Sequence, residues 1–240
     1  MTLFGIISKV SKNGRITDDM TNDERFLNNK KYGHNDMAPI GCNDCNGCDS
    51  CCHGMGDTIV QDPYDMWLFC KNMRVSGGAQ VTFELLISED GPWELSYQDG
   101  VVLPNIKMVE DGRCPFLNDK RCSIHPIRSG LCRLFPLGRA FLDDKIDYYV
   151  MGGRYGCERH SDDAHMVSIK DWLGYPDIDR YEKFQISWHE IKTNIREASS
   201  EISYEEYKKL QEKLLDYFYK IPYKDNFFDD YERRVSRWKM

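Results

Sequence analysis

Five of the ten cysteines in this 240-residue chain lie within eleven residues, at Cys42, Cys45, Cys48, Cys51 and Cys52. A spacing of two residues between successive thiols suits a shared metal, because a Cys-x-x-Cys loop offers it two sulfur atoms and nearby backbone N–H groups. Disulfide bonds fit this run poorly, since the adjacent Cys51 and Cys52 cannot bridge each other without strain. The run therefore predicts a thiolate metal site.

A second group of cysteines follows at Cys114, Cys122 and Cys132, and Cys157 comes after a predicted hairpin. Cys70 stands apart on a segment that we expect to be a helix with an apolar face, and we interpret it as a small buried hydrophobic residue. Cys42 is open to three interpretations: a spare thiol, an alternative ligand or an exposed side chain.

The two cysteine stretches resemble the CxxCxxCC family of cysteine-cluster proteins, whose domain is described as zinc- or iron-chelating. The resemblance covers roughly residues 40 to 172, and it departs from the family at Ser129, where proline is usual, and after Cys157, where Pro-Gly is usual. Its signature is carried by Cys45, Cys48, Cys51 and Cys52, and its second stretch by Cys114-Pro115-Phe116-Leu117, Cys122-Ser123-Ile124 and Cys132-Arg133-Leu134-Phe135-Pro136. With Cys157, the resemblance implies eight ligands.

Eight thiolates would complete two four-ligand centres, and thiolate softness does not separate iron from zinc. Two four-iron clusters, two zinc ions, one of each, or one centre that uses four thiolates remain open. Adjacent cysteines point in different directions in most backbone conformations, so we expect Cys51 and Cys52 to serve different metal atoms. That expectation favours an iron–sulfur cluster of the [4Fe–4S] type, with zinc as the alternative.

Charge is distributed unevenly along the chain. The net charge of −7 argues against nucleic acid as a partner, because phosphate binding needs clustered basic side chains. Residues 32–70 contain six acids and no Lys or Arg, whereas residues 113–139 carry a formal +5, so the two cysteine stretches are expected to pack together. We expect Arg133 to bind the cofactor by neutralising its thiolates and Phe116 and Phe135 to exclude water. Alternatively, the basic side chains of residues 113–139 form a solvated face.

The composition predicts a globular protein, with 41% hydrophobic residues. The N-terminal residues lack the long apolar stretch of a signal peptide, and no segment has eighteen uninterrupted apolar residues, so neither export nor membrane insertion is expected. We predict a cytoplasmic protein with no membrane partner. Cysteines in that reducing compartment are more naturally metal ligands than disulfide partners. An unidentified protein or redox partner is expected.

We predict an α+β fold with a small irregular cysteine-rich core, short antiparallel strands and a C-terminal helical extension. The expected divisions are an N-terminal arm at 1–38, a metal-binding domain at 39–175 and a helical segment at 176–240. A helix is expected to begin at Asp62-Pro63. Strands are expected at 81–88, 93–97 and 101–109, a hairpin at 140–150, and helices over 181–195 and from the capping box Ser203-x-x-Glu206 to Ile221.

The expected function is that of an iron–sulfur protein in electron transfer or cluster-dependent modification. Flagellin lysine N-methylase resembles this group in its cysteine pattern, which implies a protein-lysine N-methylase as an alternative. A structural zinc module that presents the C-terminal helices to a partner is the third hypothesis. No catalytic residue is assigned, so whether the protein is an enzyme stays open.

Overall fold

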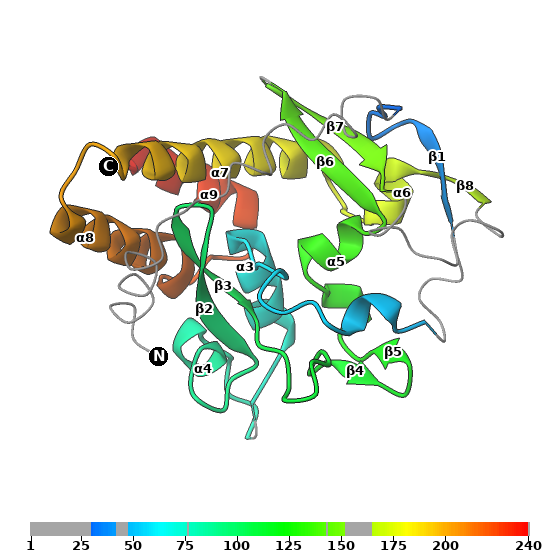
Figure 1. The fold of residues 1–240 in the computed structure, drawn as a ribbon, viewed down its shortest axis with the longest axis horizontal. Coiled ribbons are helices and arrows are strands. Elements are labelled where there is room, and N and C mark those ends of the chain that lie inside the picture. Colours follow the sequence, from blue (N-terminus) through cyan, green and yellow to red (C-terminus); the bar gives the residue numbers. More distant parts are fainter. Residues whose placement is uncertain (1–29, 42–47, 76, 143, 152–164, 240) are drawn as a thin grey trace.

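The computed structural model describes residues 30–41, 48–75, 77–142, 144–151 and 165–239, and these residues form an α+β fold. Helices α7, α8 and α9 lie on one side, the hairpin β6–β7 and the pair β1–β8 on the other, and α3 with β2–β3 between them (Figure 1). The described strands form four separate two-stranded antiparallel sheets. Small sheets of this kind need helices or irregular segments packed on them for stability.

Helix α3, Pro63–Asn72, begins where the sequence predicts it. The Asp62 carboxylate accepts a hydrogen bond from the backbone N–H of Asp65, and the Asp65 carboxylate accepts one from that of Asp62, which makes a capping box. Pro63 occupies the first helical position, where its missing N–H has no intrahelical partner to lose. The helix buries Tyr64 and Phe69 in the core.

Strands β2, Trp93–Gln98, and β3, Val101–Ile106, form the central hairpin. Its two-residue turn has positive φ at both Asp99 (44°) and Gly100 (82°), as the predicted Asp-Gly turn requires. All six residues of β3 are buried. The hairpin therefore lies in the centre of the molecule, where Trp93 packs on Phe69 of α3 at a ring distance of 5.3 Å.

The strand expected at 81–88 is wrong, because the chain forms helix α4, Phe83–Leu86, there. The Thr82 hydroxyl accepts a hydrogen bond from the N–H of Leu85 at 3.5 Å, which caps a short helix. Phe83 and Leu86 are buried, at 1% and 3% exposure. The spacing of three residues between these two side chains matches one face of a helix. The prediction followed the β-forming residues of this segment instead of that spacing.

The predicted hairpin near 140–150 is confirmed as β6, Leu137–Leu142, and β7, Lys145–Val150. Beside it, β1, Met37–Gly41, pairs with β8, His165–Ser168, and helix α6, Ile169–Leu173, follows directly. Tyr32 also forms an antiparallel bridge with Tyr148 of β7. The described part of the predicted arm is thus bound to distant strands, and residues 1–29 of the arm lie outside the described residues.

Both predicted C-terminal helices are confirmed. Helix α7, Ile178–Ala198, buries the predicted stripe of Tyr181, Phe184, Trp188, Ile191 and Ile195. Helix α8, Tyr204–Leu215, starts at the predicted capping box and continues as one π-helical turn, Asp216–Lys220.

Helix α9, Phe227–Arg237, is an element that the sequence reading missed. Phe227 and Tyr231 pack edge-on against Phe184 of α7, with ring distances of 5.1 and 4.7 Å. Phe227 also lies 5.1 Å from Tyr64 of α3, so aromatic contacts join the C-terminal helices to the centre of the molecule.

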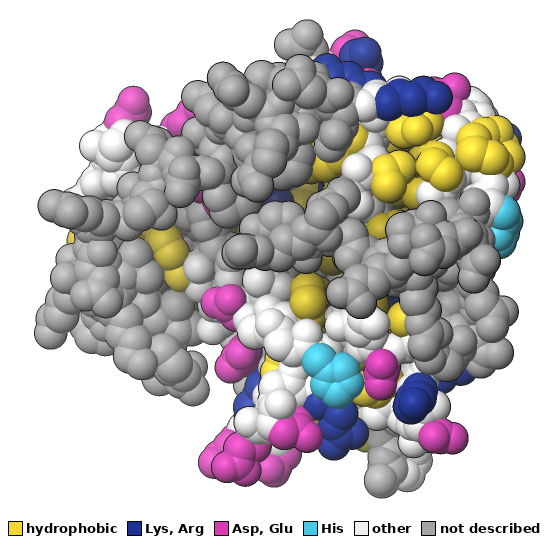
Figure 2. Space-filling model, turned by 45° about the vertical axis from the view of Figure 1, so that its right-hand side comes forward, with side chains coloured by type: hydrophobic (Ala, Val, Ile, Leu, Met, Phe, Trp, Pro, Cys, Tyr) yellow, Lys and Arg dark blue, Asp and Glu magenta, His cyan; other side chains and the backbone are white. Residues whose placement is uncertain are grey.

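The surface differs between its regions. On the face shown in Figure 2, hydrophobic side chains gather at the upper right, toward the β1–β8 pair, and charged side chains lie along the lower edge. Met37 and Met166, on β1 and β8, are 47% and 52% exposed. Within the described ranges, no helix is long and apolar enough to cross a membrane.

Gly91 sits where the chain leaves α4 for β2, and we expect Gly91→Ala to destabilise the protein. A Cβ atom there would lie 2.2 Å from the backbone oxygen of Leu86, so the backbone would have to move. We expect the free energy of unfolding to fall by about 1–3 kcal/mol, as for other overpacked sites. Urea unfolding would measure it, with Gly33→Ala as the control, because a Cβ at Gly33 would meet only the Asp36 carboxylate at 3.6 Å. Equal stability of the two variants would contradict the expectation.

Candidate metal centre

The two cysteine stretches lie side by side, as their opposite charges predict. The 3-10 turn η1, Ser50–Cys52, presents Cys51 and Cys52. The backbone N–H of Cys114 donates to the carbonyl of Cys52 at 2.8 Å, and that of Gly54 to the carbonyl of Gly112 at 2.9 Å. These backbone bonds fix the first stretch directly against the second.

A miniature hairpin brings Cys122 back toward Cys114. Strands β4, Leu117–Asn118, and β5, Arg121–Cys122, pair Leu117 with Cys122. The turn between them has positive φ at Asp119 (45°) and Lys120 (57°), and the N–H of Ser123 donates to the carbonyl of Phe116 at 2.8 Å. Seven residues lie between the two cysteines in the chain, and the hairpin folds that segment back on itself.

Cys132 lies on the short helix α5, Gly130–Leu134, which follows the 3-10 turn η2, His125–Ile127. The buried Asp65 carboxylate on α3 holds this helix in place, since it accepts hydrogen bonds from the N–H of Gly130 at 2.8 Å and the hydroxyl of Ser129 at 3.4 Å. The Ser129 hydroxyl thus supplies a side-chain link between α5 and α3.

The Cys51 and Cys52 thiols hydrogen-bond to each other. This bond lowers the pKa of Cys51 to about 7 and raises the pKa of Cys52. The expectation that these adjacent side chains point in different directions is therefore wrong. In this turn both thiols face the same side, so geometry alone does not assign them to different metal atoms.

The remaining thiols of the group are partly or fully buried, and their charges influence one another. Burial raises the pKa of Cys114, Cys122 and Cys132, and the other thiols add to the increase. Backbone N–H groups act in the opposite direction: that of Phe116 hydrogen-bonds the Cys114 sulfur, and that of Ile124 the Cys122 sulfur. Five thiols, those of Cys51, Cys52, Cys114, Cys122 and Cys132, thus form one interacting group, which we call the thiol cluster.

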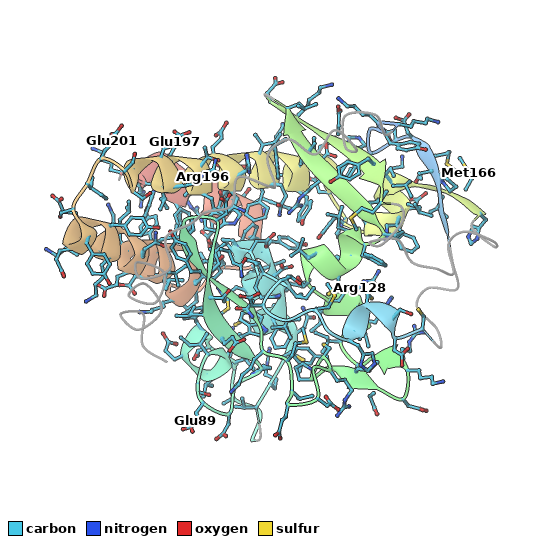
Figure 3. All side chains as sticks on the ribbon, viewed as in Figure 1. Glu89, Arg128, Met166, Arg196, Glu197 and Glu201 are labelled. Carbon is cyan, nitrogen blue, oxygen red and sulfur yellow. The ribbon has the colours of Figure 1, made fainter. Side chains whose placement is uncertain are left out.

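Arg128 is the basic residue whose charge acts on two thiols of the thiol cluster, and the sequence did not predict this role. Its charge lowers the pKa of both Cys51 and Cys122. Figure 3 shows Arg128 beside α5 and close to the η1 turn. Arg128 contacts the imidazole of His125, and its side chain is 9% exposed. The only sequence signal for it was the basic character of residues 113–139.

The predicted cofactor-binding residue Arg133 lies on the same helix as Cys132. Its Nε donates to the carbonyl of Arg128 at 3.1 Å, another guanidinium nitrogen donates to the carbonyl of Pro126, and the group lies 5.4 Å from the ring centre of Tyr175. In this arrangement Arg133 braces the backbone around η2. A direct role toward a cofactor stays a prediction.

The other predicted residues are placed as follows. Cys48 is half-buried near η1, and its thiol lies 3.8 Å from the Ser50 hydroxyl. Cys45, Cys157 and the undecided Cys42 lie outside the described residues. Phe116 packs on Phe69 at a ring distance of 5.5 Å, and Phe135 is half-buried.

Cys70 lies on α3 away from the thiol cluster, as predicted. It packs on the hydrophobic core, and burial raises its pKa to about 11.

Comparison with known proteins gives one finding: residues 44–150 match the model of the CxxCxxCC family, described as a putative zinc- or iron-chelating domain. Because of this similarity, we call residues 44–150 the CxxCxxCC domain. The CxxCxxCC domain contains the whole thiol cluster, together with Cys45, Cys48 and Arg128, and Cys157 lies beyond it. No curated protein and no solved structure matches the chain.

The donor chemistry of the CxxCxxCC domain fits a zinc or iron centre. No three His, Cys, Asp or Glu side chains of the described residues are arranged as a ready-made metal site. The thiol cluster nevertheless gathers five sulfur donors from three segments, with N–H groups and one guanidinium beside them. Thiolates favour zinc and iron over magnesium or calcium, which agrees with the family description.

Proposed function

We propose that the CxxCxxCC domain holds an iron–sulfur centre and that the protein works in electron transfer or in cluster-dependent modification. The observation that supports this proposal is the thiol cluster itself. It gathers soft sulfur donors, and backbone N–H groups hydrogen-bond two of them, the sulfurs of Cys114 and Cys122, as is typical of iron–sulfur centres. An iron–sulfur centre bound there would supply one-electron chemistry to a partner.

The surroundings of the thiol cluster support a tuned redox potential. Hydrogen bonds to the sulfur atoms, the net charge nearby and exclusion of solvent are the three factors with which proteins set the potential of such centres. Phe116 and Ile124 provide N–H groups to sulfur, Arg128 provides positive charge, and the ring of Phe116, two residues after Cys114, packs on Phe69. The positive charge of Arg128 would stabilise the reduced form of a bound centre and so raise its reduction potential.

Structural zinc is the second candidate, and one observation favours it. Cys51 and Cys52 face the same side, which suits a single ion as well as a cluster. A zinc ion would join η1, the β4–β5 hairpin and α5, three short elements with little regular structure of their own. Its work would then be to shape a surface for a protein partner. Protein-lysine methylation stays a separate prediction, which a methyl-transfer assay with S-adenosylmethionine would test.

The experiment that decides between iron–sulfur and zinc is purification without oxygen, followed by elemental analysis for iron, zinc and acid-labile sulfide and by a visible spectrum. We expect brown protein with broad absorption and about four iron and four sulfide per centre. Colourless protein with stoichiometric zinc would contradict the iron–sulfur proposal and support the structural one. Protein that binds neither metal after reconstitution would contradict both.

A further inference from the structure

A cavity of about 220 Å³ lies beside the CxxCxxCC domain's thiol cluster, between α7, the β2–β3 hairpin and β6. Leu131, which precedes Cys132 on α5, and Asp65 on α3 form the wall on the side of the thiol cluster. The opposite wall is the face of α7 that carries Trp188, Lys192 and Arg196. Figure 3 shows Arg196 on α7, above the end of the hairpin.

Cationic side chains converge on this cavity. Arg139 reaches it from β6, and Lys192 and Arg196 from α7. The Arg196 guanidinium pairs with the Asp99 carboxylate at 2.5 Å. Among the residues that the structure describes, no carboxylate lies within ion-pair distance of Arg139 or Lys192, so these two have charge to offer to a ligand. Burial, with Arg139 nearby, lowers the pKa of Lys192 to about 8, although the charges of Asp62 and Asp99 act in the opposite direction.

The three acids of the cavity are already used by the protein, and Asp99 is the one that pairs with Arg196. The Asp62 carboxylate accepts from the Asp65 N–H at 2.9 Å and from the Gln185 amide at 2.5 Å. Asp65 accepts from the N–H groups of Asp62 and Gly130, at 3.2 and 2.8 Å. Their acceptor oxygens therefore bind internal donors. A ligand ammonium would have to break these bonds, whereas a ligand anion would meet Arg139 and Lys192, on which the Asp62 charge acts only from beyond ion-pair distance.

The uncharged part of the cavity wall is mainly apolar, and it limits the size of the ligand. The apolar side chains that line it are Val60, Val101, Leu103, Leu131 and Trp188, beside the polar Gln98, Gln185, His189 and Thr193. The volume of about 220 Å³ is below the roughly 300–1,000 Å³ of pockets for drug-sized ligands. Inorganic phosphate would meet three carboxylates and several apolar side chains. An acid with one charged end and a compact apolar body matches both features.

We propose that this cavity binds a small organic carboxylate, whose charged group lies between Arg139 and Lys192 and whose apolar body packs on Leu103, Leu131 and Trp188. An arginine binds a carboxylate through two parallel hydrogen bonds, and the adjacent ammonium adds a third donor. The hydrogen bond from Arg139 to the Tyr181 hydroxyl orients the guanidinium before the ligand arrives. This site does not depend on which metal the thiol cluster holds.

The test is calorimetric titration of the full-length protein, with its own metal content, against benzoate, benzamide and inorganic phosphate. We expect benzoate to bind, benzamide to bind at least tenfold more weakly because it has no charge, and phosphate to bind more weakly than benzoate. Arg139→Gln and Lys192→Met should each weaken benzoate binding by about tenfold to a hundredfold, the range for a hydrogen bond to a charged group. Lys183→Met is the matched control, since Lys183 is an exposed lysine on the same helix and does not line the cavity.

Each outcome decides the proposal. Equal binding of benzoate and benzamide, tighter binding of phosphate, or benzoate binding that survives in both cavity variants would overturn it. No binding of benzoate or of short branched carboxylates by the unchanged protein would also overturn it. Circular dichroism and metal content identify a variant that fails to fold, and Lys192→Arg, which keeps the charge, should then retain most of the affinity. Metal content is measured separately, so failure here leaves the iron–sulfur proposal standing.

Discussion

Replacing Cys122 by serine is expected to remove most of the bound metal and to lower the melting temperature by about 10 °C or more. Cys122 lies in the β4–β5 hairpin, where its sulfur interacts with Cys51 and Cys114. A serine hydroxyl is a poor ligand for zinc or for an iron–sulfur cluster, and metal binding is coupled to folding in thiolate sites. In a domain of 150–250 residues, a loss of about 1 kcal/mol in the free energy of unfolding lowers the melting temperature by roughly 2–4 °C.

Elemental analysis and calorimetry would measure the change, together with Cys48→Ser, for which we also expect lower metal content. Cys70→Ser is the matched control, because Cys70 lies on α3, outside the thiol cluster. The control should lose some stability through its buried hydroxyl but keep its metal. Full metal content and an unchanged melting temperature in both Cys48→Ser and Cys122→Ser would remove these residues from the ligand set.

Replacing Asp65 by alanine is expected to lower the free energy of unfolding by about 3–5 kcal/mol. Asp65 is 5% exposed, and its carboxylate accepts from the N–H groups of Asp62 and Gly130 and from the Ser129 hydroxyl. Alanine would leave these donors buried without a partner, and each such group costs about 1–3 kcal/mol. Helix α5 would also lose its attachment to α3, so we expect metal content to fall because α5 carries Cys132.

Asp65→Asn is the control that separates hydrogen bonding from charge. Burial raises the pKa of Asp65 well above its ordinary value, so the buried negative charge is itself unfavourable. Asparagine keeps one acceptor oxygen and carries no charge, and we expect it to be clearly more stable than the alanine variant in urea unfolding. If alanine and asparagine were equally stable, the hydrogen bonds to Gly130 and Ser129 would not support α5 as we propose.

Local signals predicted many of the elements well. Helix α3 follows from Asp62 and Pro63, the β2–β3 turn from Asp99-Gly100, and α8 from the Ser203–Glu206 capping box. Each signal supplies a hydrogen-bonding group or an allowed φ angle within a few residues of the helix or turn that it stabilises. These helices and turns therefore depend little on contacts with distant parts of the chain. Residues 81–88 went wrong for the opposite reason, since burial of Phe83 and Leu86 outweighed their preference for strand.

The candidate metal centre could be predicted as a set of residues, but not as an arrangement. Cysteine spacing and the resemblance identified the five residues of the thiol cluster. Arg128 and the shared direction of Cys51 and Cys52 could not be predicted, because they depend on how η1, η2 and α5 pack around one another. Spacing along a chain fixes which donors are available, whereas their mutual distances depend on contacts between distant segments.

The helix caps, the tight turns, the amphipathic stripe of α7 and the candidate metal ligands could be predicted from the sequence, because each depends on residues that are neighbours in the chain. The pairing of β1 with β8, the packing of α9 on α7 and the cavity between Arg139 and Lys192 depend instead on the folded chain. These features join residues that lie roughly 40 to 130 positions apart in the chain. Bringing such distant residues together costs chain entropy, which only the burial of the whole core offsets. No local sequence pattern therefore predicts these contacts.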